Sequence, residues 1–405
     1  MTTTHSHKIG LVVAKPFNYS ETFYSSDVKI WQEMGYDVHL FLMHRGNEVN
    51  PAKTSYQLPP LPLSQNPLKW LYQIFGTFFR LLFSIRSVFR FIRLEVRDKV
   101  PFKQIIARIY ANQHLLGFKR LDIIVFGYGN LAVTRENLGQ SIKAGTVVSF
   151  KGFDISIYPY QYHTAVFNKV FANDFLFYFV SEGLHQKAKA IGFPHNKRVK
   201  YIPAYIDEAT MPPPKESWVN NNPPEIVVVG RLHWIKAHIY LILALEILHK
   251  NEHQIKLTII GDGAMYEQLF FAVKEMGLNE WVTFKGVLSK QTTLEAMKKA
   301  DLLVQSSLSE GTPNVVLEAQ YLGLPCIVTN WLGVEELITH KWNGWIVEKR
   351  NREALVNQIK EVLGLSIEEK EQIVANGQSM IGEKFNSQVQ KLAFQTLFEE
   401  AMDHE

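Results

Sequence analysis

Short apolar runs alternate with segments of helical spacing along the first half of the chain. Residues 8–14 are almost continuously apolar, which predicts a buried strand. Residues 21–34 then place apolar side chains three or four positions apart and stop at Gly35, which predicts a helix. Further strands are predicted at 36–42, 121–126, 147–150 and 175–180. Alternating strands and helices are typical of a parallel sheet that is covered on both faces.

The same alternation begins again after residues 211–224, a segment rich in proline and asparagine that we interpret as a linker. Strands are predicted at 225–230, 256–260, 301–305 and 325–329, and helices at 238–250 and 265–276. The chain is therefore expected to have α/β architecture, with Rossmann-like domains at 1–210 and 225–385. Two such doubly wound domains would face a central cleft, because open parallel sheets bind ligands at the carboxyl ends of their strands.

The composition is that of an ordinary globular protein. Of its residues, 46% are hydrophobic and 20% are charged. The length of 405 residues is sufficient for two or three domains with sizeable cores. The formal net charge of +4 argues against a nucleic-acid partner. Residues 1–7 lack the apolar core of a secretory signal, and no apolar run of about 18 residues predicts a membrane span. With Cys326 as its one cysteine, the chain fits a reducing compartment, so a cytoplasmic location is expected.

Residues 309–317 have the features of an anion-binding helix start. Thr312 can cap a helix through its hydroxyl group, and Pro313 suits the first helical position, where its missing N–H costs nothing. Gly311 adds a flexible position before them. The exposed amides and the positive dipole end of such a helix favour a diphosphate.

Charged side chains accompany this predicted helix start. Glu310 lies just before it and Glu318 within it, and a carboxylate can accept hydrogen bonds from two neighbouring ribose hydroxyls. Arg231 and Lys236 follow the strand predicted at 225–230, and they can bind a diphosphate as a planar fork and as a point charge. Taken singly, each of these residues is equally compatible with a surface charge beside a strand end. Together they predict one basic, amide-lined pocket.

These motifs resemble the retaining glycosyltransferases of family four, which have the GT-B fold. The segments 230–236 and 260–263 occur in the family's order, and Glu310 and Glu318 are separated by seven residues, as in the family's paired glutamates. The resemblance is nearly continuous over 300–336 and covers the C-terminal half strongly.

The resemblance implies a role for each matching residue. Arg231 and Lys236 would bind the donor diphosphate, and Glu318 would bind the ribose. Glu310 would contact the transferred sugar near the reaction centre. The sugar and phosphate would also be held by the backbone around Gly311, Thr312, Pro313, Asn314 and Val315. The family further implies that the last helix, 386–405, packs against the N-terminal domain.

Two positions of the C-terminal half depart from the family pattern. Ala237 stands where a glycine usually follows the lysine, and Ala264 stands where a proline is frequent. Neither departure removes a side chain that does chemistry.

Two loops of the first half are candidates for the acceptor side and the catalytic centre. Ser20 and Glu21 are ordinary residues for a helix start, but residues 20–23 also resemble family-four enzymes that build bacterial exopolysaccharides, such as colanic acid and amylovoran. Lys151 stands where the family often has a histidine near the transferred sugar. It retains a cation that could stabilise the departing phosphate, but it lacks an imidazole that titrates near neutral pH. Asp154 matches a family aspartate and is equally typical of a turn or helix cap.

Residues 66–120 form a basic, aromatic insertion in the first domain. They contain eleven Lys or Arg residues and two acidic ones. Apolar residues follow helical spacing from Leu71 to Val96, and one side carries a stripe of arginines: Arg86, Arg90, Arg93 and Arg97. A basic, Phe-rich amphipathic helix fits an anionic membrane surface. The simpler alternative is a helix packed on the domain with a solvated basic face, and no nucleic-acid-binding module accompanies the charge.

The sequence thus predicts a retaining glycosyltransferase of exopolysaccharide, lipopolysaccharide or other glycan synthesis. It would move a sugar from a nucleoside-diphosphate sugar to a carbohydrate or lipid-linked saccharide, in the cytoplasm or peripherally on the inner face of the membrane. We expect no metal ion and no cofactor, because Arg231, Lys236 and helix amides can stabilise the leaving diphosphate. A sugar-nucleotide epimerase of similar fold is one alternative, against which Glu310 and Glu318 argue. A non-catalytic sugar-nucleotide-binding scaffold of a polysaccharide assembly complex is the other, and Lys151 keeps it open.

Overall fold

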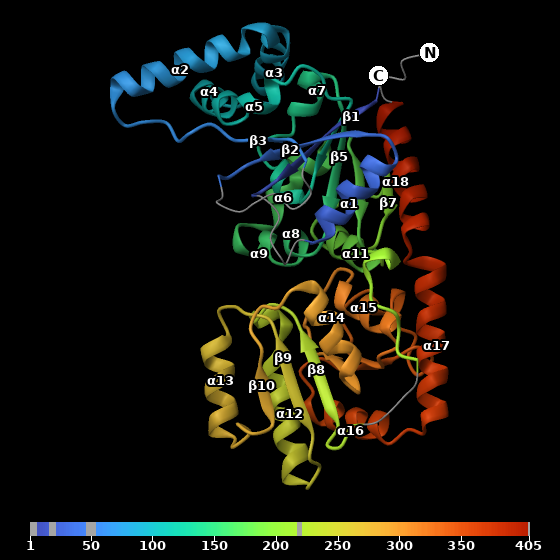
Figure 1. The fold of residues 1–405 in the computed structure, drawn as a ribbon. Coiled ribbons are helices and arrows are strands. Elements are labelled where there is room, and N and C mark those ends of the chain that lie inside the picture. The colour runs from blue at the N-terminus through green and yellow to red at the C-terminus, as the bar shows by residue number, and fades with distance from the viewer. Residues whose placement is uncertain (1–5, 16–21, 46–53, 217–220, 404–405) are drawn as a thin grey trace. The chain divides into compact units, whose positions relative to one another are not determined.

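The computed structural model describes residues 6–15, 22–45, 54–216 and 221–403. The chain divides into two compact units, which Figure 1 colours along the sequence. Unit one comprises Met1–Val180, His185–Ile202 and Lys391–Glu405, and unit two comprises Ser181–Leu184 and Pro203–Gln390. The segment 211–224, which the sequence indicated as a linker, therefore falls within unit two, and the end of the chain belongs to unit one.

Unit one is built on a parallel sheet. Its strands are β1 (Lys8–Val13), β2 (Asp37–Leu42), β3 (Tyr56–Gln57), β4 (Ile123–Phe126), β5 (Gly145–Phe150), β6 (Leu176–Phe179) and β7 (Val199–Tyr201). In the described part of the unit they are ordered β3-β2-β1-β4-β5-β6-β7 and pair in parallel throughout. β4 and β6 are apolar and buried at every position, as expected of central strands in a sheet that is covered on both faces.

Helices surround this sheet, and several of them are only one turn long. They are α1 (Thr22–Glu33), α2 (Pro67–Leu81), α3 (Ile85–Arg97), α4 (Phe102–Ala111), α5 (Gln113–Leu116), α6 (Gly129–Ala132), α7 (Leu138–Ile142), α8 (Phe153–Ser156), α9 (Tyr158–Gln161), α10 (Asn168–Ala172), α11 (Glu182–Ala190) and α18 (Ser387–Met402). The end of α18 packs in unit one, where Phe394 and Phe398 lie edge-on against Trp31 of α1, with ring centroids 5.3 and 5.2 Å away.

The helix predicted through the basic segment is in fact two helices. A 3-10 turn at Leu82–Ser84 separates α2 from α3, so the helical spacing of the apolar residues does not describe one continuous face. In the parts of the chain that the structure describes, no helix has the length and apolar character needed to cross a bilayer.

Unit two repeats the same architecture. Its strands are β8 (Glu225–Val229), β9 (Lys256–Ile260), β10 (Val282–Phe284), β11 (Leu302–Gln305), β12 (Cys326–Thr329) and β13 (Trp345–Val347). Its helices are α12 (His238–Lys250), α13 (Tyr266–Glu275), α14 (Lys290–Lys299), α15 (Asn314–Leu322), α16 (Arg352–Leu363) and α17 (Ile367–Lys384). Within the described residues the parallel strands are ordered β10-β9-β8-β11-β12-β13.

Two apolar cores cover the two faces of the unit-two sheet. Ile226 and Val228 of β8 point into one core with α12, α13 and α16, whereas Val227 points into the other with α14, α15 and α17. This alternation follows from the two-residue period of a strand. The loops that follow the strands lie outside these cores and can carry polar residues. Because β8 and β11 are direct neighbours in the sheet, the loops after these two strands lie close together.

Candidate donor site and its relatives

The loop after β8 is held in place by the loop after β9. The Leu232 N–H donates to the Asp262 carbonyl at 2.9 Å. A Cβ atom at Gly261 would lie 2.0 Å from the Gly230 carbonyl oxygen, and one at Gly263 would lie 2.6 Å from the Leu232 carbonyl oxygen. Only glycine permits this close approach of the two backbones, so the Gly-Asp-Gly turn fixes the segment that carries Arg231 and Lys236.

Lys236 ends a 3-10 turn, Trp234–Lys236, that leads into α12. The next residue, Ala237, has a left-handed backbone with φ of 52°. This is the position where the resembling family usually has glycine, and the left-handed region explains that preference. The departure at Ala237 therefore has a backbone cost, but the turn that aims Lys236 is formed.

Glu310 is the centre of a buried hydrogen-bond cluster. Its Oε1 accepts from the Lys236 Nζ at 2.6 Å, the Ser307 Oγ at 2.6 Å and the Gln305 Nε2 at 3.1 Å. The Lys236 and Glu310 side chains are only 17% and 11% exposed. Burial alone would raise the pKa of Glu310, but the Lys236 ammonium and the two neutral donors outweigh it, so the pKa is lowered. The carboxylate is thus held ionised.

The polar residues after β11 lock this cluster to the lysine loop. Ser306 Oγ donates to the carbonyl oxygens of Lys236 and Ala237 at 3.1 and 3.2 Å, and the Leu308 N–H donates to the Ile235 carbonyl at 2.7 Å. Gln305 was predicted only as the end of a strand, and Ser306 and Ser307 were not predicted as site residues. The available signal was a run of three polar residues directly after three buried apolar positions of β11.

The predicted helix start is present, displaced by one residue. α15 begins at Asn314, and its N-cap is Pro313, whose ψ of 111° is extended and whose own side chain makes no capping hydrogen bond. The prediction of Pro313 in the first helical position was wrong, because the chain enters the helical conformation only after Pro313. Thr312 lies one residue before this N-cap. The N–H groups of Val316 and Leu317 donate to the Pro313 carbonyl. The amides of Asn314 and Val315 are therefore the first two of the helix. Such an end attracts an anion.

Glu318 lies one turn into α15 and is mostly buried. Its Oε1 is 3.4 Å from the Nζ of Lys290, the first residue of α14, whose side chain is about half exposed. The sequence did not single out Lys290, because its partner lies on another helix. A carboxylate at this place keeps one oxygen for a further donor.

Arg231 is exposed and has no side-chain hydrogen bond or ion pair among the described residues. Burial, together with Arg231 and Lys236, lowers the pKa of His233 in the same loop. The loop after β8 therefore carries two cations beside a neutral imidazole. Among the described residues no three His, Cys, Asp or Glu side chains gather as a metal site.

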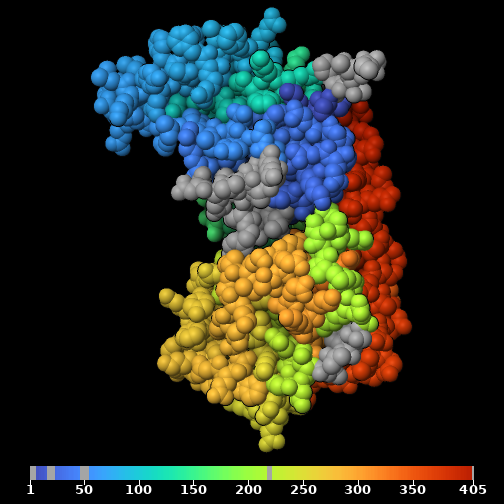
Figure 2. Space-filling model, in the orientation of Figure 1, coloured from blue at the N-terminus to red at the C-terminus, as the bar shows by residue number. Residues whose placement is uncertain are grey.

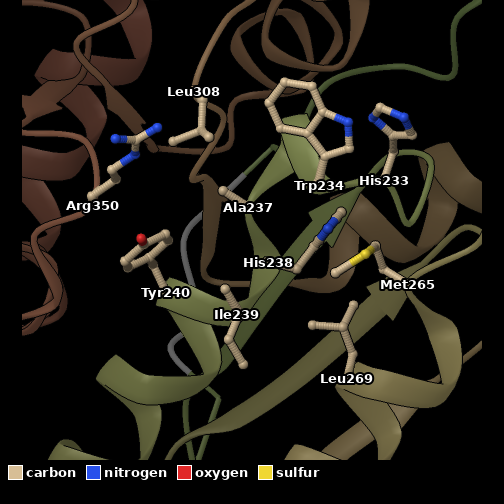
Figure 3. A pocket seen from close by; sticks show the side chains of 10 residues that line it. All are labelled: His233, Trp234, Ala237, His238, Ile239, Tyr240, Met265, Leu269, Leu308 and Arg350. Carbon is tan, nitrogen blue, oxygen red and sulfur yellow. The ribbon is translucent and has the colours of Figure 1, made fainter.

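A pocket of about 280 Å³ borders the lysine turn. It is lined by His233, Trp234, Ala237, His238, Ile239, Tyr240, Met265, Leu269, Leu308 and Arg350. Figure 3 shows Trp234 and His238 on the side of Met265 and Leu269, with Arg350 at the other end. His238 is 3% exposed, and its Nε2 has no partner among the described residues. Burial and then Lys236 lower the pKa of His238 to about 4, so its imidazole is neutral.

In unit one, Lys151 is buried among aromatic rings. Its Nζ donates to the Asp27 Oδ2 at 3.2 Å and lies 4.7, 5.5 and 5.2 Å from the ring centroids of Phe23, Tyr24 and Tyr178. Burial would lower the pKa of Lys151, but Asp27 outweighs it and raises the pKa. The ammonium is therefore charged and bound to Asp27, a partner that the sequence did not reveal.

Asp154 holds the backbone of its own loop. Its carboxylate accepts from the N–H groups of Gly129 at 2.9 Å, Gly152 at 2.9 Å and Lys151 at 3.1 Å. Burial raises the pKa of Asp154 to about 6 although these bonds oppose it. This geometry is that of the turn and cap alternative. The catalytic assignments of Lys151 and Asp154 stay predictions, and Ser20 and Glu21 lie outside the described residues.

Known proteins resemble both the region of unit two and the chain as a whole. Residues 214–380 match the family Glycosyl transferases group 1. WcaL of Escherichia coli, described as a colanic acid biosynthesis glycosyltransferase, is 23% identical over 94% of this chain and 97% of its own length. The amylovoran biosynthesis glycosyltransferase AmsK of Erwinia amylovora is 26% identical over 83% of this chain and 86% of its own.

The fold is shared with solved structures. Anabaena HepE, solved with UDP and glucose, superposes with a TM-score of 0.69 over 97% of this chain and 100% of its own, at 16% identity. The two parallel sheets and this likeness confirm the predicted α/β class and GT-B fold. Residues 214–380 are a Glycosyl transferases group 1 domain, and the chain as a whole is homologous to the colanic acid and amylovoran glycosyltransferases.

Proposed function

We propose that this glycosyltransferase moves a sugar from a nucleoside-diphosphate sugar to a hydroxyl of a carbohydrate or lipid-linked saccharide, with the anomeric configuration retained. The names of its relatives support a role in exopolysaccharide synthesis. The observation that carries the proposal is the ionised Glu310, which Lys236, Ser307 and Gln305 fix four residues before the start of α15. This arrangement joins an anion site to an immobilised carboxylate.

The leaving group sets the main electrostatic demand of the reaction. The bond between the anomeric carbon and the diphosphate oxygen breaks, and its electron pair leaves with the diphosphate. The acceptor hydroxyl forms the new bond, and its proton can be taken up by the diphosphate product. Arg231, Lys236 and the first amides of α15 would stabilise the charge that develops, and such an interaction lowers the barrier because it strengthens in the transition state.

The ribose and the transferred sugar of the nucleotide-sugar donor are also assigned partners in unit two. Glu318 is placed to accept hydrogen bonds from the ribose, and Glu310 is placed to hold a hydroxyl of the transferred sugar. Because the cations and helix amides together balance a diphosphate, the proposal includes neither a metal ion nor a cofactor. We also propose that the enzyme associates peripherally with the inner face of the membrane, where a lipid-linked acceptor would be found.

A donor panel tests the proposal. The purified protein is incubated with nucleoside-diphosphate sugars in the presence of EDTA, and release of nucleoside diphosphate is followed with and without lipid extract. Glu318→Ala and Arg231→Ala are the site variants, and Lys274→Ala, an exposed charge of α13, is the matched control. Release that lipid extract stimulates, that persists in EDTA and that both site variants lose would support the proposal. No release and no nucleotide binding from any donor would refute it.

The non-catalytic scaffold is the second candidate. It is favoured by one observation, the Lys151 ammonium that is bound to Asp27 in the family histidine's place. Nucleotide binding by calorimetry that depends on Arg231 and Glu318, without release from any donor and acceptor, would favour this second candidate.

A further inference from the structure

An ordinary surface helix buries its apolar face. Helix α2 instead exposes most of its apolar side chains to solvent. Its buried residues are Thr77 and Leu81. The Thr77 Oγ1 donates to the Gln73 carbonyl and lies 3.3 Å from the Gln113 Oε1 of α5. The Gln73 side chain accepts from the Ser64 N–H and donates to a carbonyl of the preceding loop. Gln73 and Thr77 of α2 therefore face the protein, whereas Lys69 and Arg80 are exposed.

The opposite side of α2 carries exposed apolar residues. They recur three or four positions apart and continue past the helix end, and we call them the aromatic ridge: Leu68, Tyr72, Phe75, Phe79 and Phe83. Tyr72 is 80% exposed and Phe83 is 97% exposed. In the view of Figure 1, α2 lies on the outer side of unit one with α4 and α5 between it and the sheet, and in Figure 2 its atoms form a projection. An exposed apolar surface of this kind marks an interaction site.

The basic segment 66–120 presents little free negative charge, because one of its two acidic residues is buried and the other is paired. Glu95 is fully buried and accepts from Arg108 at 2.6 Å and from Asn137 at 3.0 Å. Asp98 accepts from the Asn137 side chain at 3.0 Å, lies 3.4 Å from the Lys169 Nζ and pairs with the Nε of the exposed Arg97 at 3.4 Å.

The arginines of α3 divide into one internal and three external residues. α3 buries Val88, Phe91 and Glu95, and at 100° per residue its opposite face carries three exposed arginines: Arg86, Arg93 and Arg97. Arg90, predicted to belong to the same stripe, donates instead to the Ser141 carbonyl at 2.7 Å. The stripe therefore has three outward members.

We propose that the aromatic ridge inserts into the interface of an anionic bilayer while Arg86, Arg93 and Arg97 contact its lipid headgroups. The 15 residues of α2 are too few to span a bilayer, so the helix would lie in the plane of the membrane surface. A second copy of this chain is a poorer occupant, because it would bring identical arginines together. The inference rests on the proposed function in that a lipid-linked acceptor would be found on the same surface.

Sedimentation of the full chain with vesicles tests the inference without any donor. The vesicles are phosphatidylcholine alone or phosphatidylcholine mixed with phosphatidylglycerol. Combined replacement of Tyr72→Ser, Phe75→Ser and Phe79→Ser should weaken binding to the anionic vesicles at least about a hundredfold. Its thermal unfolding midpoint should stay unchanged, because the replaced side chains face outward.

Charge is tested with a matched pair of triple variants. Arg86→Gln with Arg93→Gln and Arg97→Gln should weaken binding by about fivefold per arginine, and added salt should weaken it further. The control removes three exposed unit-two charges, Lys250→Gln, Lys274→Gln and Lys360→Gln, and should bind as the wild type does.

Some outcomes would overturn the inference. Anionic vesicles that do not sediment the wild type would do so, as would undiminished binding by the folded serine variant. A dimer that the serine variant dissociates, without lipid binding, would assign the ridge to a second copy instead. Failure of the proposed function is read separately, as absence of nucleoside-diphosphate release from every donor, because sedimentation needs no turnover.

Discussion

Lys236 and Glu310 form a 2.6 Å ion pair between the loops that follow two neighbouring strands, β8 and β11. The cation proposed for the leaving diphosphate and the carboxylate proposed for the sugar are therefore one electrostatic unit. Removal of either charge leaves the other mostly buried without its partner, which is costly. The two residues should not behave independently.

Single and double variants of this pair should show strong coupling. Lys236→Met should lower kcat by about a hundredfold, because one stabiliser of the developing charge is lost. Glu310→Gln keeps the hydrogen-bonding shape but removes the charge, so kcat should fall while donor affinity is retained or increases. The double variant should be far less impaired than the product of the two effects. Steady-state kinetics of nucleoside-diphosphate release measure this, and simple multiplication of the two effects would contradict it.

Glu318 should determine recognition of the ribose. Loss of a hydrogen bond to a charged group costs about 1.5–3 kcal/mol, so Glu318→Ala should weaken donor binding by about tenfold to a hundredfold. The wild type should prefer a ribonucleotide donor over its 2′-deoxy analogue, and the variant should not. Calorimetry with both nucleotides is the measurement.

Lys290→Ala is the matched control for Glu318. It removes the partner at 3.4 Å from a half-exposed position, where an ion pair contributes little. Donor affinity and the ribose preference should therefore stay close to those of the wild type. An equal loss in both variants would show that Glu318 acts through the ion pair rather than on the ribose.

The sequence predicted those parts of the fold and site that rest on local pattern. α12 and β9 have their predicted bounds, because strong apolar periodicity and clear breakers delimit them. β3, β7, β10 and β13 were missed, since two or three residues carry too little pattern. Arg231, Lys236, Glu310 and Glu318 could be found because their spacing is a motif. Ser307, Lys290 and Asp27 could not, because their importance arises only from tertiary contacts.

The buried pair of Lys151 and Asp27 should be costly to break. Asp27→Asn leaves an ammonium without its counter-charge among aromatic rings, so the free energy of unfolding should fall by about 3–5 kcal/mol. Replacement of both residues, Lys151→Met with Asp27→Leu, should restore most of this stability, because apolar side chains suit the site. Urea unfolding followed by circular dichroism measures both effects.

The same double variant separates a catalytic from a structural lysine. If Lys151 acts on the reacting phosphate, as predicted from the sequence, the stable double variant should have lost turnover by about a hundredfold or more. A double variant that folds and retains full kcat would reduce Lys151 to a residue that holds α1 against β5.

His238 should make unit two sensitive to acid. Its pKa is lowered from the ordinary 6.5 to about 4. Above about pH 6.5 neither the folded nor the unfolded chain is protonated there, so the group contributes no pH dependence. Between about pH 6.5 and 4 the unfolded chain binds a proton that the folded chain does not. The free energy of unfolding should therefore fall as the pH falls, by up to about 3 kcal/mol from this residue.

A histidine titration measures this shift directly. In carbon-13-labelled protein the His238 imidazole, assigned by its absence from His238→Gln, should stay neutral until the pH approaches 4. The variant cannot bind this proton, so its free energy of unfolding should depend less on pH over the same window. Nucleotide binding near neutral pH should change little, because the native imidazole is uncharged there. A midpoint near 6.5 would show that the pocket admits water to His238 and that burial does not control its charge.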